Sequence, residues 1–537
     1  MELRDYQNEA IEAIRKEWKD HNRTLLVLPT GCGKTIVFSK VAQARAKLGR
    51  VLILAHRDEL LDQAADKLRK SFGVESCKEK ASESCIGRSE PVVVGSVQTL
   101  QSLKRLEKFP RGYFQTIIVD EAHHAVSESY RRVLEYFDGA KVLGVTATPD
   151  RGDMKNLGEF FESLAYEYSL RDAINNGYLS PIRVKTMPLE IDMSNVKVSA
   201  GDYQLDEVGN ALEPYLESIA KEMAKECKGK HTVVFLPLVR ISQKFRDVLH
   251  KYGLRAGEVN GESKNREEVL KDFENGKYDV LCNSMLLTEG WDCPIVDCIV
   301  VLRPTKVRAL YCQMIGRGTR LAEGKDHLLV LDFLWMTGKH RLMHPADILC
   351  KKEETADAVT KAIEEAEDGA DLIAIERDVE EERKRALAKA LAEMEAKANR
   401  KKKKLIDPLD FELSIDSTDF SDYVPAFGWE AEEASEKQVA YLENLQIDAH
   451  GLNKGQAKLL IDNCKKRMDA GLATPRQIKL LRRSGFQHVP EWTKEEASKI
   501  IGMLAAVNWQ IWKAHIVPGV YVPESLQGKY GRYLLND

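Results

Sequence analysis

The chain has 537 residues, of which 43% are hydrophobic and 31% are charged, and its formal net charge is −4. This length exceeds what one hydrophobic core usually serves, so we expect two to four globular domains. Lys and Arg number 80 against 84 Asp and Glu, which excludes a globally basic nucleic-acid-binding protein. Any nucleic-acid surface must therefore be local.

The N-terminus and the cysteines indicate a soluble intracellular protein. The first ten residues, MELRDYQNEA, lack the basic start and apolar core of a signal peptide, and no apolar run approaches the roughly 18 residues of a membrane span. The ten cysteines show no C-x-x-C spacing, and the closest pair, Cys293 and Cys298, has no second pair or histidine partners. We expect a reduced chain without structural zinc.

The first element that carries chemistry is the glycine-rich turn LPTGCGKT, between a predicted strand at 25–28 and a predicted helix at 35–46. Backbone N–H groups of such a turn converge on phosphate oxygens at the helix N-terminus. Lys34 is expected to reach the β- and γ-phosphates, and Thr35 to hold Mg²⁺. A chance Gly-Lys-Thr run is the alternative, and Leu28 replaces the first glycine of the pattern G-x-x-x-x-G-K-[ST]. The other residues expected to line the phosphates are Thr30, Gly31, Cys32 and Gly33.

A second motif supplies the acids that a nucleotide site needs. In TIIVDEAHHA an apolar strand ends in Asp120 and Glu121, and ligands of open α/β sheets gather at such strand ends. Asp120 is expected to hold Mg²⁺, and Glu121 to polarise the water that attacks the γ-phosphate. A solvated acidic turn is the alternative for this motif alone. Both motifs together predict a nucleoside triphosphatase.

The segments PTGCGKT, DEAH and VTATP, in this order, resemble motifs I, II and III of superfamily 2 helicases of the DEAH type, of the kind found in phages and prophages. This superfamily often lacks the first glycine of motif I, so Leu28 agrees with the resemblance. Over about the first 340 residues other segments resemble the remaining motifs: LRDYQNEAI the Q-motif, LILAHRDELLDQA and VVGSVQTL the strand-contacting motifs, VVFLPLV motif IV, LLTEGWDCP motif V and QMIGRGTR motif VI.

The resemblance implies an α/β fold with two RecA-like parallel-sheet domains in tandem, and an enzyme that hydrolyses ATP with Mg²⁺ as its cofactor. It implies an ATP-dependent helicase or translocase that acts on nucleic acid, in the cytoplasm of a bacterial or phage-infected cell. Gln7 would recognise the adenine edge, and Gly290 and Asp292 would lie near the ribose. Gln313 would help to orient the attacking water.

The resemblance also places the coupling and nucleic-acid residues. His123 would link the nucleotide site to motif III through Thr146 or Thr148, whereas we expect no separate role for His124. For His56 alone, a structural histidine is the alternative to a nucleic-acid contact. The residues expected to contact nucleic acid are His56, Arg57, Ser96, Gln98, Thr99 and Thr288.

Arg317 and Arg320 of motif VI are candidates for the arginine finger that stabilises charge on the γ-phosphate in the transition state. They lie three residues apart and would share one face if the segment is helical. A solvated basic face is the alternative for an isolated pair. The short apolar runs TVVFLP, YDVLCNS, CIVVL and HLLVLDF, separated by helical stretches, predict a second parallel sheet that would carry these arginines. Two such lobes can close on ATP and open after hydrolysis.

We predict RecA-like domain 1 at 1–168, RecA-like domain 2 at 169–348, a charged helical linker at 349–410 and a helical accessory region at 411–537. The linker is rich in Ala, Glu, Lys and Arg and ends in a basic run at 400–404. That run could contact nucleic-acid phosphates or could be a charged spacer.

The accessory region contains a weak two-copy repeat with a spacing of 39 residues. Each copy is expected to start a helix at a cap, Ser435 or Thr474, and to continue through a loop into a second capped helix. The sequence therefore predicts paired helical hairpins. A DNA-binding accessory is the favoured interpretation, and a partner-docking or purely structural module is the alternative.

The sequence favours DNA over RNA as the partner, because it has DEAH rather than DEAD and VTATP rather than a Ser-Ala-Thr version of motif III. It indicates no membrane partner and specifies no protein partner. Two alternatives remain open: an ATP-switched nucleic-acid-binding scaffold without processive unwinding, and an RNA helicase.

Overall fold

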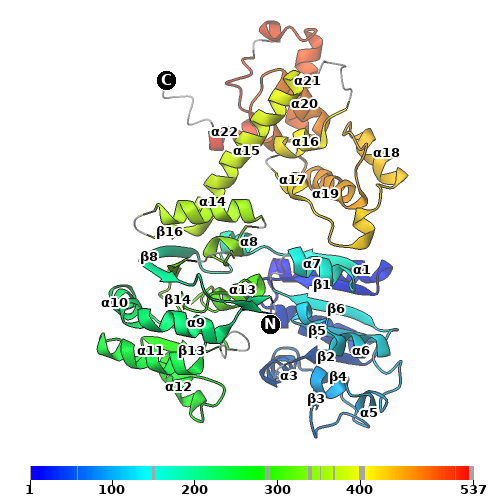
Figure 1. Cartoon of the computed structure of the whole chain (residues 1–537). Coiled ribbons are helices and arrows are strands. Elements are labelled where there is room, and N and C mark those ends of the chain that lie inside the picture. The colour runs from blue at the N-terminus through cyan, green and yellow to red at the C-terminus, as the bar shows by residue number, and fades with distance from the viewer. Residues whose placement is uncertain are drawn as a thin grey trace. The chain divides into compact units, whose positions relative to one another are not determined.

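The computed structural model describes residues 2–56, 58–147, 151–199, 201–284, 287, 291–336, 341–350, 352–366, 369–397, 405–415, 417–514 and 516–530. The chain divides into two compact units, Met1–Val379 and Glu380–Asp537 (Figure 1). Within the described part of the chain, no helix has both the length and the apolar character that crossing a bilayer requires.

The first sheet of unit 1 has seven strands in the order β3-β4-β2-β5-β6-β1-β7, and all its neighbours pair in parallel. Its central strands read as continuous apolar runs because helices cover both faces. The strands are β1 Arg23–Val27, β2 Val51–Ala55, β3 Ser76–Glu79, β4 Val92–Ser96, β5 Thr116–Asp120, β6 Lys141–Thr146 and β7 Ser163–Glu167. The helices are α1 Asp5–Asp20, α2 Lys34–Arg45, α3 Asp58–Phe72, α4 Val97–Leu100, α5 Leu103–Leu106, η1 Ala122–His124, α6 Glu128–Tyr136 and α7 Arg151–Gly158.

The second sheet also has seven strands, in the order β12-β13-β11-β14-β15-β8-β16, and only β16 runs antiparallel to its neighbour. The prediction of two parallel-sheet domains in tandem is therefore confirmed. The strands are β8 Ile182–Asp192, β11 Thr232–Phe235, β12 Ala256–Val259, β13 Val280–Asn283, β14 Cys298–Val301, β15 Leu328–Met336 and β16 Ala370–Asp371. A small hairpin consists of β9 Val198–Ser199 and β10 Asp202–Tyr203. The helices are α8 Leu170–Asn175, α9 Leu205–Leu212, η2 Glu213–Tyr215, α10 Leu216–Glu226, α11 Val239–Lys251, α12 Arg266–Glu274, α13 Arg308–Gly316, η4 Pro345–Ile348 and α14 Glu353–Glu364.

The rest of the described chain is helical, as predicted. The charged region forms one long helix, α15, which spans Leu372–Lys397. The basic run at 400–404 lies outside the described residues. The elements that follow are α16 Pro408–Ser414, α17 Asp419–Asp422, η5 Gly428–Ala431, α18 Glu436–Asn444, α19 Lys454–Asp469, α20 Pro475–Arg483, η6 Val489–Glu491, α21 Lys494–Ala506, η7 Ile511–Ala514, η8 Glu524–Leu526 and α22 Gln527–Tyr530.

Helices α18 and α19 form one hairpin, and α20 and α21 form another (Figure 1). Ser435 and Thr474 are their N-caps, and each side chain accepts a hydrogen bond from the backbone N–H three residues later. Each hairpin has its own buried cluster, which includes Leu442 in the first and Trp492 in the second. The predicted caps and the paired helices are thus both present, and residues outside the hairpins, such as Phe411, complete the buried clusters.

The prediction of a fully reduced chain is wrong for one pair of cysteines. Cys77 on β3 forms a disulfide with Cys85, and their Cα atoms lie 5.7 Å apart. The chain reverses between them, with an isolated antiparallel bridge from Lys80 to Glu83. This turn brings together two cysteines whose spacing carries no recognisable signal. The other eight cysteines are free and buried.

Candidate functional site

The glycine-rich turn follows β1 and ends at the start of α2. Gly31 and Gly33 adopt the left-handed conformation, with φ of 90° and 75°. A Cβ on Gly33 would lie 2.8 Å from Nε2 of Gln7, and a Cβ on Gly31 would lie 2.8 Å from Cδ2 of Leu179. Both positions therefore require glycine. The resulting backbone cradle is of the kind that accepts phosphate at a helix N-terminus.

The start of α1 packs against this turn. Gln7 donates from Nε2 to the carbonyl of Cys32 at 3.3 Å, and the Tyr6 hydroxyl donates to the same carbonyl at 2.8 Å. The backbone N–H of Arg4 donates to Oε1 of Gln7 at 3.1 Å. Burial raises the pKa of Cys32 to about 11 and that of Tyr6 to about 12, so both are neutral at pH 7. Neither places an anion beside the cradle.

The acid pair lies at the end of β5, and both carboxylates are buried. Glu121 has a left-handed backbone with φ of 49° and ψ of 59°, which is uncommon for a non-glycine residue and concentrates at functional sites. Lys34 Nζ lies 3.5 Å from Oε1 of Glu121. The structure therefore brings the lysine of motif I and the acid of motif II together.

Strand order explains this meeting. β6 lies between β1 and β5, with Val27 opposite Thr146 and Asp120 opposite Val145. The carboxyl ends of the three strands consequently lie side by side. The backbone N–H of Leu28 donates to the carbonyl of Thr146 at 3.1 Å, which joins the first residues of the turn to the end of β6.

His123 lies beside the acid pair in η1. Its Nδ1 is 3.3 Å from Oγ1 of Thr146 and 3.6 Å from Oε2 of Glu121. The predicted link to motif III is thus present as a contact with Thr146. Thr148 lies outside the described residues.

His124 occupies a position that the sequence analysis did not anticipate. Its ring contacts that of His123 with centroids 4.1 Å apart, and contacts that of His56 edge-on with centroids 4.4 Å apart. The three imidazoles form a continuous row from the end of β2 to the acid pair. The sequence shows two adjacent histidines in DEAHHA, but only the fold shows that the ring of His56 lies in contact with that of His124.

The polar residues that follow β2 and β4 also lie together. Gln98 donates from Nε2 to the carbonyl of His56 at 2.7 Å, and Ser96 Oγ donates to Oε1 of Gln98 at 2.8 Å. Oγ1 of Thr99 accepts the N–H of Ala81 at 3.0 Å. Parallel pairing of β2 with β4 brings these segments to one edge of the sheet. Two predicted partners of this group, Arg57 and Thr288, lie outside the described residues.

Motif VI supplies the cations from the second sheet. Helix α13 contains the buried Gln313 and ends at Gly316, so Arg317 is its C-cap and Arg320 lies in the loop beyond. The shared face was conditional on a helix through both arginines, and this condition is not met, because the helix ends before either of them. Arg317 donates from Nη1 to the carbonyl of Trp291 at 2.6 Å.

Arg320 lies against the glycine-rich turn. Its Cγ is 3.5 Å from the place that a Cβ on Gly31 would occupy, and its guanidinium forms an ion pair with Asp292. Burial lowers the pKa of Arg320 to about 10, so the group stays protonated at neutral pH. Gly290, which is predicted to lie near the ribose with Asp292, is outside the described residues.

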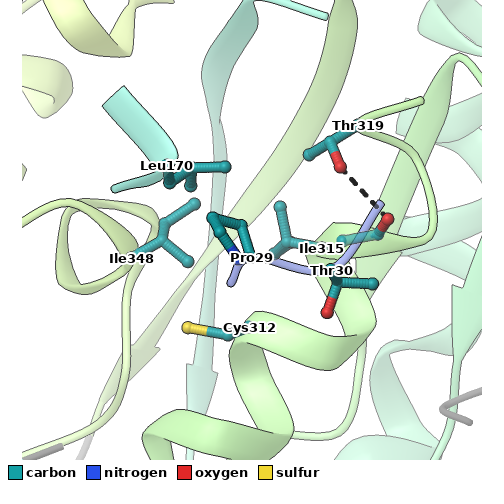
Figure 2. Close-up of a pocket in the computed structure, with 8 residues that line it drawn as sticks. Pro29, Thr30, Leu170, Cys312, Ile315, Thr319 and Ile348 are labelled. Atoms are coloured by element: carbon teal, nitrogen blue, oxygen red, sulfur yellow. Dashed lines mark hydrogen bonds between the residues drawn. The ribbon is translucent and has the colours of Figure 1, made fainter. Parts of the chain in front are cut away.

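The motif VI loop is bonded to the segment before β8, and the end of α13 packs against the glycine-rich turn. Ser180 donates from its backbone to the carbonyl of Thr319 at 2.7 Å, and from Oγ to the carbonyl of Arg320 at 3.0 Å. A Cβ on Gly316 would lie 2.6 Å from Cβ of Thr30. Figure 2 shows the small, mostly apolar cavity between these segments, with Thr319 donating to the carbonyl of Gly316 at 3.1 Å. This close packing requires glycine at 316.

Lys325 is a site residue that the sequence analysis missed. Its ammonium group donates to the carbonyls of Gly318, Arg320 and Pro294, the last two at 2.7 and 3.4 Å. Burial lowers its pKa to about 8, so at neutral pH it is protonated and its three donors meet three acceptors. It therefore fixes the loop that carries Arg320. A lysine in a polar loop gives no sequence signal for such a role.

Known proteins share this organisation. Residues 1–151 match the family described as type III restriction enzyme, res subunit, and residues 215–322 match the helicase conserved C-terminal domain. Among its relatives is "Putative ATP-dependent helicase IRC3" of Saccharomyces cerevisiae, which is 34% identical over 62% of this chain and 51% of its own length. The "51.5 kDa protein" of Lactococcus phage (isolate 7-9) is 30% identical over 56% of this chain and 64% of its own length.

A third relative is the "DNA 3'-5' translocase XPB2" of Sulfurisphaera tokodaii, which is 26% identical over 64% of this chain and 84% of its own length. The chain thus spans about half the length of the yeast relative and less than two thirds of that of the phage protein. The matched regions contain the glycine-rich turn and the acid pair of the first sheet and the motif VI arginines that follow α13. In its fold, its motif order and these matches, the chain is similar to the superfamily 2 helicases.

Proposed function

We propose that the chain is an ATP-dependent helicase or translocase that acts on DNA. The observation that carries this proposal is one arrangement of charged groups. Lys34 and Glu121 of the first sheet face each other at 3.5 Å, while Arg320 of the second sheet packs its stem against Gly31 of the same turn. A triphosphate in this cradle would meet an acid, an ammonium group and a guanidinium from two different lobes.

The chemistry follows from what each group can do. Lys34 binds the β- and γ-phosphates, Glu121 takes the proton of the attacking water, and Gln313 orients that water. Arg317 and Arg320 stabilise the charge that develops on the γ-phosphate. Arg320 must exchange its ion pair with Asp292 for the phosphate, so its action requires movement of the loop or lobe.

The residues present also fit Mg²⁺ and the nucleoside. The left-handed glycines leave an open cradle that a Cβ would fill, and a hydroxyl at Thr35 with a carboxylate at Asp120 is a donor set that suits Mg²⁺. When bound, Mg²⁺ neutralises phosphate charge. Gln7 recognises the adenine edge, while Gly290 and Asp292 lie near the ribose.

Nucleic acid is proposed to lie across the polar edge after β2 and β4. Hydroxyl and amide groups there suit sequence-independent phosphate contacts: those of Ser96, Gln98, Thr99 and Thr288, with His56 and Arg57. His123 links this edge to the nucleotide site through Thr146 or Thr148. DNA is favoured over RNA by the DEAH and VTATP motifs and by the similarity to a named DNA 3'-5' translocase, which also supports 3'→5' polarity.

The chain is proposed to contain four parts, which are RecA-like domains at 1–168 and 169–348, a linker at 349–410 and a helical accessory region at 411–537. The first sheet lies wholly within the first range, and six strands of the second lie within the second range. β16 falls in the proposed linker, where it pairs with β8.

The test measures ATP hydrolysis by the full chain with no nucleic acid, and with single-stranded DNA, forked and blunt duplex DNA, and RNA. We expect DNA to raise turnover at least tenfold and Lys34→Ala to abolish both basal and stimulated turnover. Strand displacement on the same substrates separates unwinding from translocation alone. Absence of stimulation by every DNA and RNA would contradict the proposal.

The same panel tests the two alternatives. An ATP-switched scaffold predicts ATP-dependent binding of nucleic acid with negligible turnover, although a switch has no need for the buried Glu121 and Gln313. An RNA helicase predicts stimulation by RNA and none by DNA.

A further inference from the structure

The two hairpins of unit 2 have the same internal framework. In each, the glutamine three residues after the N-cap donates from its side chain to the carbonyl of the first residue of the second helix. Gln438 reaches Lys454 at 3.0 Å, and Gln477 reaches Lys494 at 3.2 Å. Because the framework is shared, α18 and α20 can be compared position by position.

The exposed residues of the two first helices differ in charge. With the spacing of 39 residues, α18 has Lys437, Ala440, Glu443 and Asn444 where α20 has Arg476, Lys479, Arg482 and Arg483. Helix α18 also has an acid in its first turn, whereas α20 has no acid at all. Helix α20 is therefore strongly cationic, although the framework that both hairpins share does not require this charge.

The cations of α20 point away from its core. Arg476 and Arg483 are seven residues apart, which places them within about 20° of each other around the helix axis, and Arg482 flanks them. All three are exposed, while Ile478 and Leu481 face the core. We call Arg476, Arg482 and Arg483 the α20 face. Within the part of the chain that the structure describes, these three form no ion pair.

Helix stability does not account for this face. Arg482 and Arg483 lie in the last turn, where the helix dipole favours cations, but Arg476 lies in the first turn, where it disfavours them. Lys479 and Arg483 are like charges four residues apart, which is also unfavourable. Lys479 is held in place by a local contact, since its ammonium donates to the carbonyl of Leu405 at 3.1 Å.

The cationic surface continues beyond the helix. Arg482 lines a hollow of about 1070 Å³ together with Arg467, His488 and Lys529. The acid in its lining, Glu491, is already paired with Lys529 at 2.6 Å. Because Lys529 and Glu491 balance each other's charge, Arg467 is the further cation that a long polyanion crossing the α20 face would meet.

We propose that the α20 face binds the phosphate backbone of nucleic acid and that the matching surface of α18 does not. The inference rests on the proposed function, since it supplies that enzyme with a second, sequence-independent grip on its substrate. Exposed arginines without anionic partners suit phosphate because the guanidinium offers a planar fork of donors. Neutralising phosphates releases counterions, so such a contact makes affinity depend on salt.

The test compares two charge-matched variants of the full chain. The α20 variant carries Arg476→Gln, Arg482→Gln and Arg483→Gln. The control carries Lys437→Gln, Lys465→Gln and Lys466→Gln, three exposed lysines of the first hairpin. Fluorescence anisotropy with labelled single-stranded and duplex DNA measures affinity between about 50 and 200 mM salt. Thermal unfolding and basal ATP hydrolysis check that both variants are intact.

We expect the α20 variant to lower the slope of log affinity against log salt by about two to three units, because each lost phosphate contact removes about 0.7 to 0.9. The control is expected to change the slope by less than about one. Equal slopes for both variants, or an unchanged slope in the α20 variant, would overturn the inference while leaving DNA-stimulated ATP hydrolysis intact. Absence of any nucleic-acid binding by the wild type would overturn the proposed function as well.

Discussion

The two sheets of unit 1 have the same strand order, although the last strand is parallel in the first sheet and antiparallel in the second, and they carry different functional groups. Numbered from the first strand of each, both follow the order 3-4-2-5-6-1-7. In the first sheet, strand 1 leads into the glycine-rich turn and strand 5 ends in Asp120 and Glu121. In the second, strand 1 leads into a small hairpin, and just past the end of strand 5 stands the buried Arg303.

This comparison teaches that the architecture repeats while the chemistry does not. The first lobe supplies the phosphate cradle and the acids, and the second supplies guanidinium groups from the loop after α13. The first lobe already holds Lys34 beside Glu121, so what the proposed site gains when the lobes meet is the arginines of the second lobe. Substitutions in the two lobes should therefore affect ATP binding and turnover to different extents.

The largest effect is expected from Lys34→Ala in the first lobe. Loss of the ammonium group should remove both phosphate binding and charge stabilisation, and lower kcat by about 1000-fold or more. Steady-state ATP hydrolysis and binding of a fluorescent ATP analogue measure the two losses. Thermal unfolding close to that of the wild type is the control. Near-normal turnover in this variant would show that the first lobe takes no part in ATP hydrolysis.

Arg320→Ala in the second lobe should lower kcat about 100- to 1000-fold. Because Arg320 pairs with Asp292 rather than with the first lobe's acids, ATP affinity should change only a few-fold. Titration with the ATP analogue separates affinity from turnover. Arg320→Lys keeps the charge without the planar fork and should recover part of the rate. Equal losses of ATP affinity and of turnover would contradict the expected difference between the two lobes.

Lys325 is not expected to contact the nucleotide, but Lys325→Met should still lower kcat about tenfold. The variant loses two hydrogen bonds to the loop that carries Arg320 and one to the carbonyl of Pro294, each worth about 1 kcal/mol in stability. Lys277→Met, at an exposed lysine of the same lobe, is the matched control. If both variants behave alike in ATP hydrolysis, Lys325 does not position the loop.

His124→Ala should have the smallest effect and a selective one. It interrupts the row of imidazoles from His56 to His123, so stimulation by DNA should fall about three- to fivefold while basal hydrolysis stays unchanged. His124→Phe keeps an aromatic ring in the row and should restore most of the stimulation. A parallel fall in basal and stimulated rates would indicate loss of structure at the acid pair instead.

Sequence patterns predicted most of the fold because they reflect local physics. Apolar runs of strand length alternating with helices predict the second sheet, and the caps Ser435 and Thr474 lie where the pattern places them. The glycine-rich turn is also predictable from the sequence, since φ values of 90° and 75° require glycine at Gly31 and Gly33. A shared face for Arg317 and Arg320 depends on a helix through both residues, and α13 instead ends at Gly316, close to a second glycine at 318.

The sequence by itself determined which chemical groups the chain has and the local backbone that presents them, because caps, turns and periodicity depend on neighbours within a few residues. Only the tertiary structure decided which groups meet: Lys34 with Glu121, Arg320 with Gly31, His124 with His56, and Cys77 with Cys85. The first three contacts follow from strand order and lobe packing, and the last from a turn without a recognisable signal. Side-chain proximity across a sheet is set by the pairing of strands distant in sequence, and no local pattern encodes it.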